Sequence, residues 1–433
     1  MGKGYEAEMT DQIWHQLLPG CPRRLAETAE RALEQVAPYW ARVDRLVLKN
    51  QAKVLRAFQE AQVADLHFAT STGYGYSDVG REKIDEVFAR TFRTEAALVR
   101  AQFGSGTHAI ACGLFGALRP GDRLIAAAGS PYDTLQTVIR GGTGSLAEWG
   151  IQFEEVPLLP DGHVDLDGVC RAVRQPDARV LFIQRSRGYS LRPSLTVPAI
   201  GEIIQAAKAA NPEIVVVVDN CYGEFTQEQE PSEVGADLVC GSLIKNPGGG
   251  IAPTGGYVVG RRDLVERAAA RLFAPGIGME VGANFGVNRL FLQGLFLAPH
   301  VTGEALKGAQ FTAALFAALG FGVRPTYDAE RSDLVQTVEL GSGEALVAFC
   351  EAVQHASPVD SYVRPEPWAM PGYDDPVVMA AGTFVQGSSI ELSADGPMRP
   401  PFAAYFQGGL TREHVIYAAL SAANELMGRG ILR

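Results

Sequence analysis

Short apolar runs alternate with helical segments through the middle of the chain. The most apolar run, IVVVV at 214–218, leads directly into Asp219. A strand of a parallel sheet is buried on both faces and reads as a continuous hydrophobic run, and helices connect such strands. The pattern therefore predicts an α/β fold with a mostly parallel sheet. The expected strands lie at 96–101, 124–128, 180–184, 214–218 and 238–240.

The segments on either side of these runs have a different character. Residues 1–64 carry apolar side chains at helical spacing from residue 22 onward and predict an N-terminal helical arm. Beyond residue 300, a helical stretch ends at a glycine stop, and short strand-like runs (FGVRP, DLVQTVEL, SSIEL) then alternate with helical ones. We predict a large domain over 65–300, a linking helix near 300–320 and a small α+β domain over 301–433.

The charge, the N-terminus and the cysteine spacing disfavour several classes of function. The formal net charge of -11 disfavours a nucleic-acid binder, because such proteins gather Lys and Arg against phosphates. The N-terminus lacks the basic start and apolar run of a signal peptide, and no apolar run approaches the ~20 residues of a membrane span. The cysteines show no CxxC spacing, which argues against a metal site. We expect a cytoplasmic protein that acts on a small molecule, with no membrane or nucleic-acid partner and no metal.

Lys245 stands apart from the other lysines. Lysine is the side chain that offers a primary amine, which an aldehyde cofactor needs for covalent attachment. The other lysines lie near a terminus or among polar residues in helical patterns, whereas Lys245 follows the apolar run ADLVCGSLI and precedes the glycine-rich NPGGG. It would therefore lie at a strand end, the edge at which α/β sheets bind ligands. The alternative is a buried lysine that a carboxylate neutralises.

Asp219 ends the most apolar run and would face the same edge of the sheet. A buried carboxylate is costly unless it is paired. Asp219 could pair with the protonated ring nitrogen of a pyridine cofactor, which makes the ring an electron sink. It could equally cap the following turn together with Asn220.

The segment FGSGTHAIACGLFGAL places a glycine-rich turn before an apolar helix. Such a helix N-terminus presents free backbone N–H groups to an anion such as phosphate. The candidate ligands are Ser105, Gly106 and Thr107. Many turns of this kind bind nothing, so the segment is informative only together with Lys245 and Asp219. A nicotinamide site is a weaker alternative, because the full spaced-glycine fingerprint and a ribose-binding acid are missing.

Taken in order, the glycine turn, VVVDNCYGEF and GADLVCGSLIK resemble the fold-type I pyridoxal-5′-phosphate (PLP) enzymes of cysteine and methionine metabolism. Within that group the chain is most similar to the methionine gamma-lyase-like proteins often labelled aluminium resistance proteins. The resemblance runs from about residue 70 to residue 260 and returns at QGSSIELSADGPMR. It implies a seven-stranded sheet in the large domain, PLP as the cofactor, and a homodimer or homotetramer whose active sites are shared between subunits.

The resemblance also gives roles to single residues. Lys245 corresponds to the lysine that forms a Schiff base with PLP, and Asp219 corresponds to the partner of the pyridine nitrogen. Tyr132 in AAAGSPYDT corresponds to the aromatic residue that stacks on the pyridine ring. The residues that correspond to phosphate ligands are Gly106, Thr107 and Ser242.

One part of the family pattern is missing. In the lyases, a Tyr-x-Arg signature upstream of the phosphate turn supplies a tyrosine and an arginine to the phosphate of the neighbouring subunit, but here the stretch reads Tyr76–Ser77–Asp78. Arg81 is the candidate replacement for the arginine. Tyr74 or Tyr76 is the candidate for the tyrosine on the substrate side. Ile244 also stands before the lysine, where the lyases often carry a hydroxyl residue.

A substrate carboxylate is best bound by the planar fork of an arginine. Arg399 in SADGPMRPPF is the candidate, since the family takes this residue from its C-terminal domain. The alternative is a surface arginine beside a proline-rich turn. Arg185 and Arg187 follow the strand at 180–184, so one of them could contact cofactor or substrate, unless both lie in a solvated loop.

Together these residues predict a PLP-dependent lyase that breaks a carbon–sulfur bond of an amino acid by β- or γ-elimination and releases a keto acid and ammonia. The freed amine of Lys245 would remove the α-proton. A γ-replacement transferase and an aminotransferase are alternatives with the same cofactor residues. A non-catalytic binding or regulatory protein on the same fold is an alternative of a different class.

Overall fold

The computed structural model describes residue 14, residues 16–370 and residues 373–432. The chain divides into two compact units. The large unit is Leu48–His300, and the small unit combines Met1–Val47 with Val301–Arg433. The division falls inside two helices, α2 (Arg23–Glu60) and α9 (Asn288–Ala318). The segment expected to form one N-terminal arm therefore contributes to both units, and the expected linking helix is part of α9.

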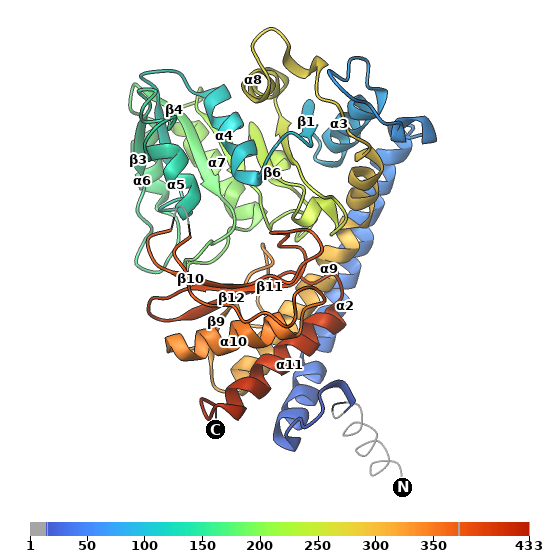
Figure 1. Ribbon diagram of the computed structural model, residues 1–433. Helices are drawn as coiled ribbons and strands as arrows, with labels where there is room; N and C mark the ends of the chain where they lie inside the picture. Colours follow the sequence, from blue (N-terminus) through green and yellow to red (C-terminus); the bar gives the residue numbers. More distant parts are fainter. Residues whose placement is uncertain (1–13, 15, 371–372, 433) are drawn as a thin grey trace. The chain divides into compact units, whose positions relative to one another are not determined.

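The large unit is an α/β structure around one seven-stranded sheet (Figure 1). The strand order is β1-β7-β6-β5-β4-β2-β3. Neighbours from β6 to β3 run parallel, and β7 runs antiparallel to both of its neighbours. The predicted α/β fold with a mostly parallel sheet is confirmed. The strands are β1 (Ala96–Arg100), β2 (Arg123–Ala126), β3 (Gln152–Glu155), β4 (Ala178–Gln184), β5 (Val215–Asp219), β6 (Leu238–Ser242) and β7 (Gly256–Gly260).

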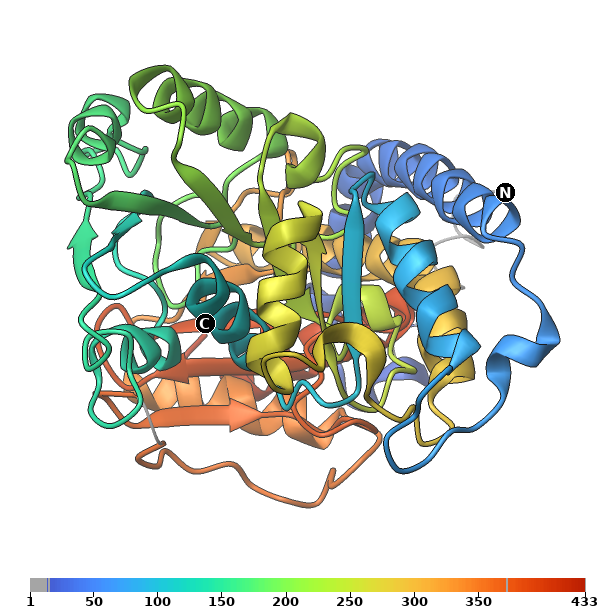
Figure 2. The same ribbon diagram turned by 90° about the horizontal axis from the view of Figure 1, so that it is seen from above.

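Helices cover both faces of this sheet, with α7 on one side of the strands and α4 and α8 on the other (Figure 2). In β5, Val216 and Val218 join one core and Val215 and Val217 join the other, which explains why this strand is apolar throughout. The helices of the unit are α3 (Val79–Thr91), α4 (Gly106–Ala117), α5 (Asp133–Arg140), α6 (Leu166–Val173), α7 (Val197–Ala210) and α8 (Arg262–Leu272). Its short 3-10 turns are η1 (Asp65–Phe68), η2 (Pro231–Val234), η3 (Asn246–Gly248) and η4 (Gly278–Glu280).

The small unit is α+β, as predicted for the C-terminal part of the chain. Its five-stranded antiparallel sheet has the order β10-β11-β12-β9-β8. One core packs this sheet against the apolar faces of its helices. The elements are β8 (Gly322–Arg324), β9 (Gln336–Glu339), α10 (Gly343–His355), β10 (Val377–Ala380), β11 (Ser393–Pro397), β12 (Ala403–Gln407) and α11 (Arg412–Gly428).

One predicted strand of the small unit is wrong. The run SSIEL at 388–392 is not a strand, and β11 begins only at Ser393. The buried carboxylate of Glu391 accepts hydrogen bonds from the backbone N–H groups of Phe384, at 2.8 Å, and Val385, at 2.9 Å. These side-chain bonds stabilise an irregular loop in place of a sheet ladder.

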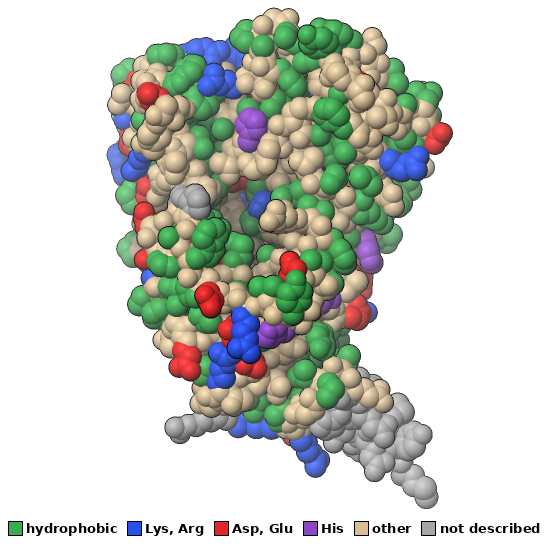
Figure 3. All heavy atoms as spheres, viewed as in Figure 1, with side chains coloured by type: hydrophobic (Ala, Val, Ile, Leu, Met, Phe, Trp, Pro, Cys, Tyr) green, Lys and Arg blue, Asp and Glu red, His purple; other side chains and the backbone are tan. Residues whose placement is uncertain are grey.

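Three further features concern the surface charges, the helices and the cysteines. Acidic and basic side chains lie close to one another on the face drawn in Figure 3 and are not separated by sign. Within the described part of the chain, no helix is long and apolar enough to cross a bilayer. All six cysteines are free thiols, and five of them are buried.

Candidate active site

The carboxyl ends of β5 and β6 bring three of the predicted residues together. Asp219 is the last residue of β5 and Ser242 the last residue of β6, and Lys245 follows three positions later. The two strands are adjacent and parallel, so these ends lie at one edge of the sheet. Asp219 and Ser242 are buried, whereas Lys245 is partly exposed. The strands thus present an amine and a carboxylate side by side.

Asp219 has few groups that compensate its charge. Its Oδ1 accepts a hydrogen bond from the backbone N–H of Cys221 at 3.0 Å. Burial raises the pKa of Asp219 above its ordinary value, and the hydrogen bonds of Cys221 and the charge of Lys245 oppose that rise without cancelling it. A cation that approached this carboxylate would therefore stabilise its ionised form strongly.

Lys245 lies against an aromatic ring. Its Nζ is 3.6 Å from the centroid of the Tyr222 ring. Burial lowers the pKa of Lys245, but Tyr222, Cys221 and Asp219 outweigh burial, and the pKa lies above its ordinary value. Without a covalent partner, this amine is therefore charged at neutral pH.

The predicted phosphate turn begins α4 at the same edge. Ser105 caps the helix, and its Oγ accepts a hydrogen bond from the backbone N–H of His108 at 3.1 Å. The N–H groups of Gly106 and Thr107 have no hydrogen-bond partner among the residues that the structure describes. A Cβ on Gly106 would lie 3.1 Å from the Cβ of Ser242 and 3.3 Å from Sγ of Cys221. The helix N-terminus is thus packed onto the strand ends that carry Asp219 and Lys245.

Tyr132 lies near both the N-terminal turn of α4 and Asp219. It precedes α5, and its backbone N–H donates to Oε1 of Gln184 at 2.9 Å. Its hydroxyl lies 2.9 Å from Oγ1 of Thr107. Burial, followed by the negative charge of Asp219, raises the pKa of Tyr132 well above its ordinary value. Tyr132 therefore keeps its proton and remains a hydrogen-bond donor.

These residues fit the requirements of PLP. The unpartnered N–H groups at the start of α4 suit a phosphate, and the buried carboxylate of Asp219 suits a protonated ring nitrogen. The amine of Lys245 suits an aldehyde, and the glycine at position 106 leaves space where a side chain would collide. The fit involves residues of the large unit alone.

The tyrosines of the 72–81 loop lie elsewhere. Tyr74 and Tyr76 are 71% and 63% exposed, and their rings stack on each other with centroids 5.4 Å apart. Arg81 is buried, and its guanidinium donates to the carbonyls of Gly75, Gly282 and Glu280 at 2.7, 3.2 and 3.2 Å. In this chain Arg81 fixes the loop, and the roles of all three side chains at a phosphate or substrate stay predictions.

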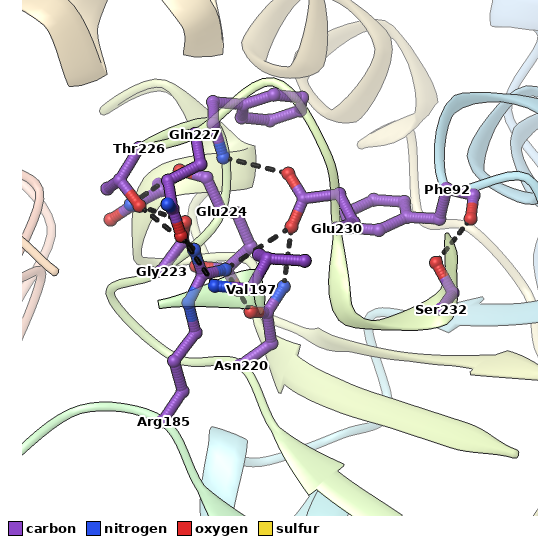
Figure 4. Close-up of polar contacts among 12 residues, drawn as sticks. Phe92, Arg185, Val197, Asn220, Gly223, Glu224, Thr226, Gln227, Glu230 and Ser232 are labelled. Carbon is purple, nitrogen blue, oxygen red and sulfur yellow. Dashed lines mark hydrogen bonds and ion pairs between the residues drawn. The ribbon is translucent and has the colours of Figure 1, made fainter. Parts of the chain in front are cut away.

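The candidate arginines occupy three different settings. Arg185 is fully buried, and its NH1 donates to Oδ1 of Asn220 at 2.7 Å and lies 3.5 Å from Oε2 of Glu230 (Figure 4). Arg187 is buried as well, so the alternative of a solvated loop is wrong for both residues. Arg399, in the small unit, is paired with Asp375 at 2.9 Å, and the side chains of this pair are half-exposed. Arg185 is thus a structural residue, and substrate roles for Arg187 and Arg399 stay predictions.

The residues that support the site were not predicted from the sequence. Tyr222 and Cys221 contact the predicted catalytic groups from the turn after β5, and Asn220 and Glu230 hold that turn. The available signal was the polar segment NCYGEFTQEQE, which follows directly on the most apolar strand. It showed that the segment was unusual, but not which side chains face Lys245.

Comparisons with known proteins show the family of this chain. The profile of the methionine gamma-lyase family matches residues 25–427. The Bacillus subtilis (strain 168) protein YnbB is 49% identical over 412 residues, which cover 94% of this chain and 98% of that protein. A Clostridium novyi NT structure, described as a carbon-sulfur lyase involved in aluminum resistance, is 45% identical with a TM-score of 0.92 and covers 97% of this chain and 99% of its own. The L-methionine gamma-lyase of Pseudomonas putida is 29% identical over 195 residues, 45% of each chain.

These similarities confirm the family that the sequence resembled and the fold-type I architecture. The chain belongs to the methionine gamma-lyase family, whose cofactor is PLP.

Proposed function

We propose that the protein eliminates the sulfur group of a sulfur-containing amino acid, with PLP bound to Lys245, and releases a keto acid and ammonia. One observation carries the proposal: the N-terminus of α4 packs onto the strand ends that bear Asp219, Ser242 and Lys245. The name of the Clostridium novyi relative supports carbon–sulfur cleavage, and the name of the family supports methionine as a substrate.

Each residue at this edge would hold one part of the cofactor. The N–H groups of Gly106 and Thr107 would bind the phosphate, with the hydroxyls of Ser105 and Ser242 as further donors. Tyr132 would stack on the ring. Asp219 would accept a hydrogen bond from the ring nitrogen, and Lys245 would bond to the aldehyde carbon.

When bound, PLP supplies an electron-poor ring that accepts the electron pair left on the α-carbon of the substrate. Lys245, in its neutral form, would take the α-proton of the bound substrate. Tyr132 keeps its own proton and can donate a hydrogen bond at the reacting end of the substrate. Arg399 and Arg187 are the candidates for the substrate carboxylate.

The attachment site is tested by borohydride reduction followed by peptide mass mapping. We expect a PLP adduct on Lys245 and none in Lys245→Ala. Lys307→Ala is the matched control, because Lys307 is a buried lysine with charged neighbours. An adduct that persists in Lys245→Ala would contradict the assignment.

The reaction is tested by measuring keto acid release from methionine, cystathionine, homocysteine and cysteine in parallel. An added thiol then reveals whether the sulfur group is replaced instead of eliminated. We expect keto acid and ammonia in equal amounts from at least one substrate. Amino exchange without keto acid from a sulfur substrate would favour an aminotransferase, and PLP-bound protein inert towards all four would favour a binding protein.

We also propose that two copies of the chain share their active sites. The exposed, stacked rings of Tyr74 and Tyr76 suit a surface that a second subunit covers. If Tyr76 acts in the neighbouring subunit, mixing inactive Lys245→Ala with inactive Tyr76→Ala restores one intact site per mixed dimer. Activity that does not return after subunit exchange would contradict shared sites.

A further inference from the structure

Tyr222 contacts Lys245, and none of the roles proposed above explains this contact. The ring face of Tyr222 lies under the Lys245 amine, with Nζ 3.6 Å from the ring centroid, and the two side chains are also hydrogen-bonded. A cation over an aromatic face is attracted by the ring quadrupole, and the attraction grows as water is excluded. The contact therefore favours the charged amine over the neutral one.

The backbone of Tyr222 is held in a conformation that a tyrosine seldom adopts. Its φ is +70°, in the left-handed region. Such a conformation persists only where the surroundings enforce it. The unusual backbone conformation therefore indicates that the surrounding structure fixes the position of the Tyr222 side chain.

A buried polar network enforces this turn (Figure 4). The side chain of Asn220 accepts from Arg185 at 2.7 Å and donates to Oε2 of Glu230 at 3.0 Å. The backbone carbonyl of Asn220 accepts from the N–H of Gly223 at 2.8 Å. Gly223 packs directly on Arg185, since a Cβ there would lie 2.4 Å from Cδ of the arginine. Tyr222 is thus held between two residues that the network fixes.

We propose that Tyr222 is a positioning residue for Lys245, whose ring and hydroxyl hold the charged amine at the sheet edge while a substrate occupies the cofactor. This proposal rests on the proposed function, because it assumes that PLP binds to Lys245. Tyr222 stabilises the state in which Lys245 has been displaced, and it thereby favours substrate binding.

Other groups also act on Lys245 and must be separated from Tyr222. Asp219 and Cys221 lie on the same turn as Tyr222 and raise the pKa of Lys245 as well. Tyr132 lies close enough to Asp219 and Tyr222 for their charges to affect it. None of these groups changes in a Tyr222 variant, so a difference between variants reports on the ring and hydroxyl of Tyr222.

The test titrates the holoenzyme with glycine, which has no sulfur group to eliminate, and follows the visible absorption of the bound cofactor. In this exchange the nitrogen of glycine replaces that of Lys245 on the aldehyde carbon. One carbon–nitrogen double bond forms as another breaks. Two of the three protons on the glycine ammonium pass to Lys245, whose nitrogen already carries one, so Lys245 is released as an ammonium. The apparent dissociation constant of glycine therefore depends on how well the released ammonium is stabilised.

We expect Tyr222→Leu to raise this dissociation constant by roughly 3- to 10-fold, in line with a partly desolvated cation–π contact. Tyr222→Phe keeps the ring and loses the hydroxyl, so its dissociation constant should lie between those of the wild type and Tyr222→Leu. Cofactor content should stay at the wild-type level in both variants. A general loss of structure would lower cofactor content and would not produce this order.

Wild-type dissociation constants in both folded variants would overturn the proposal. If Tyr222→Leu does not fold, Tyr222→Phe decides alone, and an unchanged dissociation constant overturns the proposal. A wild-type protein without a Lys245-dependent visible band would instead overturn the proposed function, so the two failures are distinguishable.

Discussion

Lys307 and Lys245 are two lysines that lie against other side chains of the protein, and their surroundings differ. In the small unit, Lys307 is buried, and its Nζ lies 2.9 Å from Glu304 and 2.5 Å from Asp44. In the large unit, Lys245 is partly exposed and lies over the ring of Tyr222. Lys307 is a lysine neutralised by carboxylates, which is the alternative that was open for Lys245.

The difference teaches what a reactive lysine needs. Two carboxylates form ion pairs with the buried amine of Lys307, so its role is structural. The ring of Tyr222 also favours a charged amine, but Lys245 as a whole is only partly buried. The carboxylate of Asp219, at the same edge, is available for a different partner.

The largest expected effect comes from removing the charge of Asp219. Asp219→Asn keeps the shape of the side chain but leaves the cofactor nitrogen without an anion, so kcat/KM should fall by roughly 10²- to 10³-fold. The visible band that depends on Lys245 should remain, because attachment does not need the charge. Steady-state kinetics and an absorption spectrum measure both.

Glu304→Gln is the matched control for that change. It removes a carboxylate charge from beside Lys307, and we expect activity within about threefold of the wild type together with a loss of stability. Asp219→Asn with near wild-type kcat/KM would remove the distinction between the two carboxylates.

A smaller effect is expected from Lys307→Met, which replaces the amine by an apolar group of similar length. Glu304 then loses its buried partner, whereas Asp44 is 61% exposed and can be solvated. The free energy of unfolding should fall by about 1.5–3 kcal/mol, without loss of PLP attachment. Denaturant unfolding and cofactor content are the measurements. Unchanged stability would show that Lys307 contributes no more than a surface ion pair.

The sheet and its site edge were predictable because their causes are local in sequence. The run IVVVV forms β5 with Asp219 at its end, and the GSGT turn begins α4, as continuous apolar runs and glycine turns predict. Lys245 was found because an apolar strand precedes it and glycines follow it. These features need no knowledge of distant residues.

The supporting residues could not be predicted because their partners are remote in sequence. The buried guanidinium of Arg185 meets polar groups of residues 220–230 across the fold, and nothing beside Arg185 in the sequence indicates this pairing. Arg81 likewise binds carbonyls at 280 and 282, far along the chain. The run SSIEL was predicted as a strand because the bonds of Glu391 to 384 and 385 cannot be read from apolar patterning.

A third buried carboxyl extends the comparison. Glu224 is fully buried, and its Oε1 accepts a hydrogen bond from the hydroxyl of Tyr257 at 2.6 Å. Its Oε2 has no hydrogen-bond partner within the part of the chain that the structure describes. Burial raises the pKa of Glu224 to about 8, against an ordinary value of 4.5. Where Glu304 is neutralised by a lysine, Glu224 is neutralised by its own proton.

The smallest expected effect is therefore a pH dependence of stability. The folded protein holds the proton of Glu224 up to about pH 8, whereas the unfolded chain releases it near pH 4.5. Below pH 4.5 Glu224 is protonated in both states and does not lower the free energy of unfolding. As the pH rises from 4.5 towards 8, only the unfolded chain releases the proton, and the free energy of unfolding falls. Between pH 6 and 8 the free energy of unfolding should fall by about 2 kcal/mol.

Glu224→Gln should remove this slope, because the amide cannot ionise. Urea unfolding at pH 6, 7 and 8 compares the variant with the wild type. The control is Glu228→Gln, which alters an exposed carboxylate of the same segment and should leave the slope unchanged. Parallel slopes in wild type and Glu224→Gln would mean that Glu224 is ionised in the folded protein, and Arg185 would then have to balance two buried carboxylates in place of one.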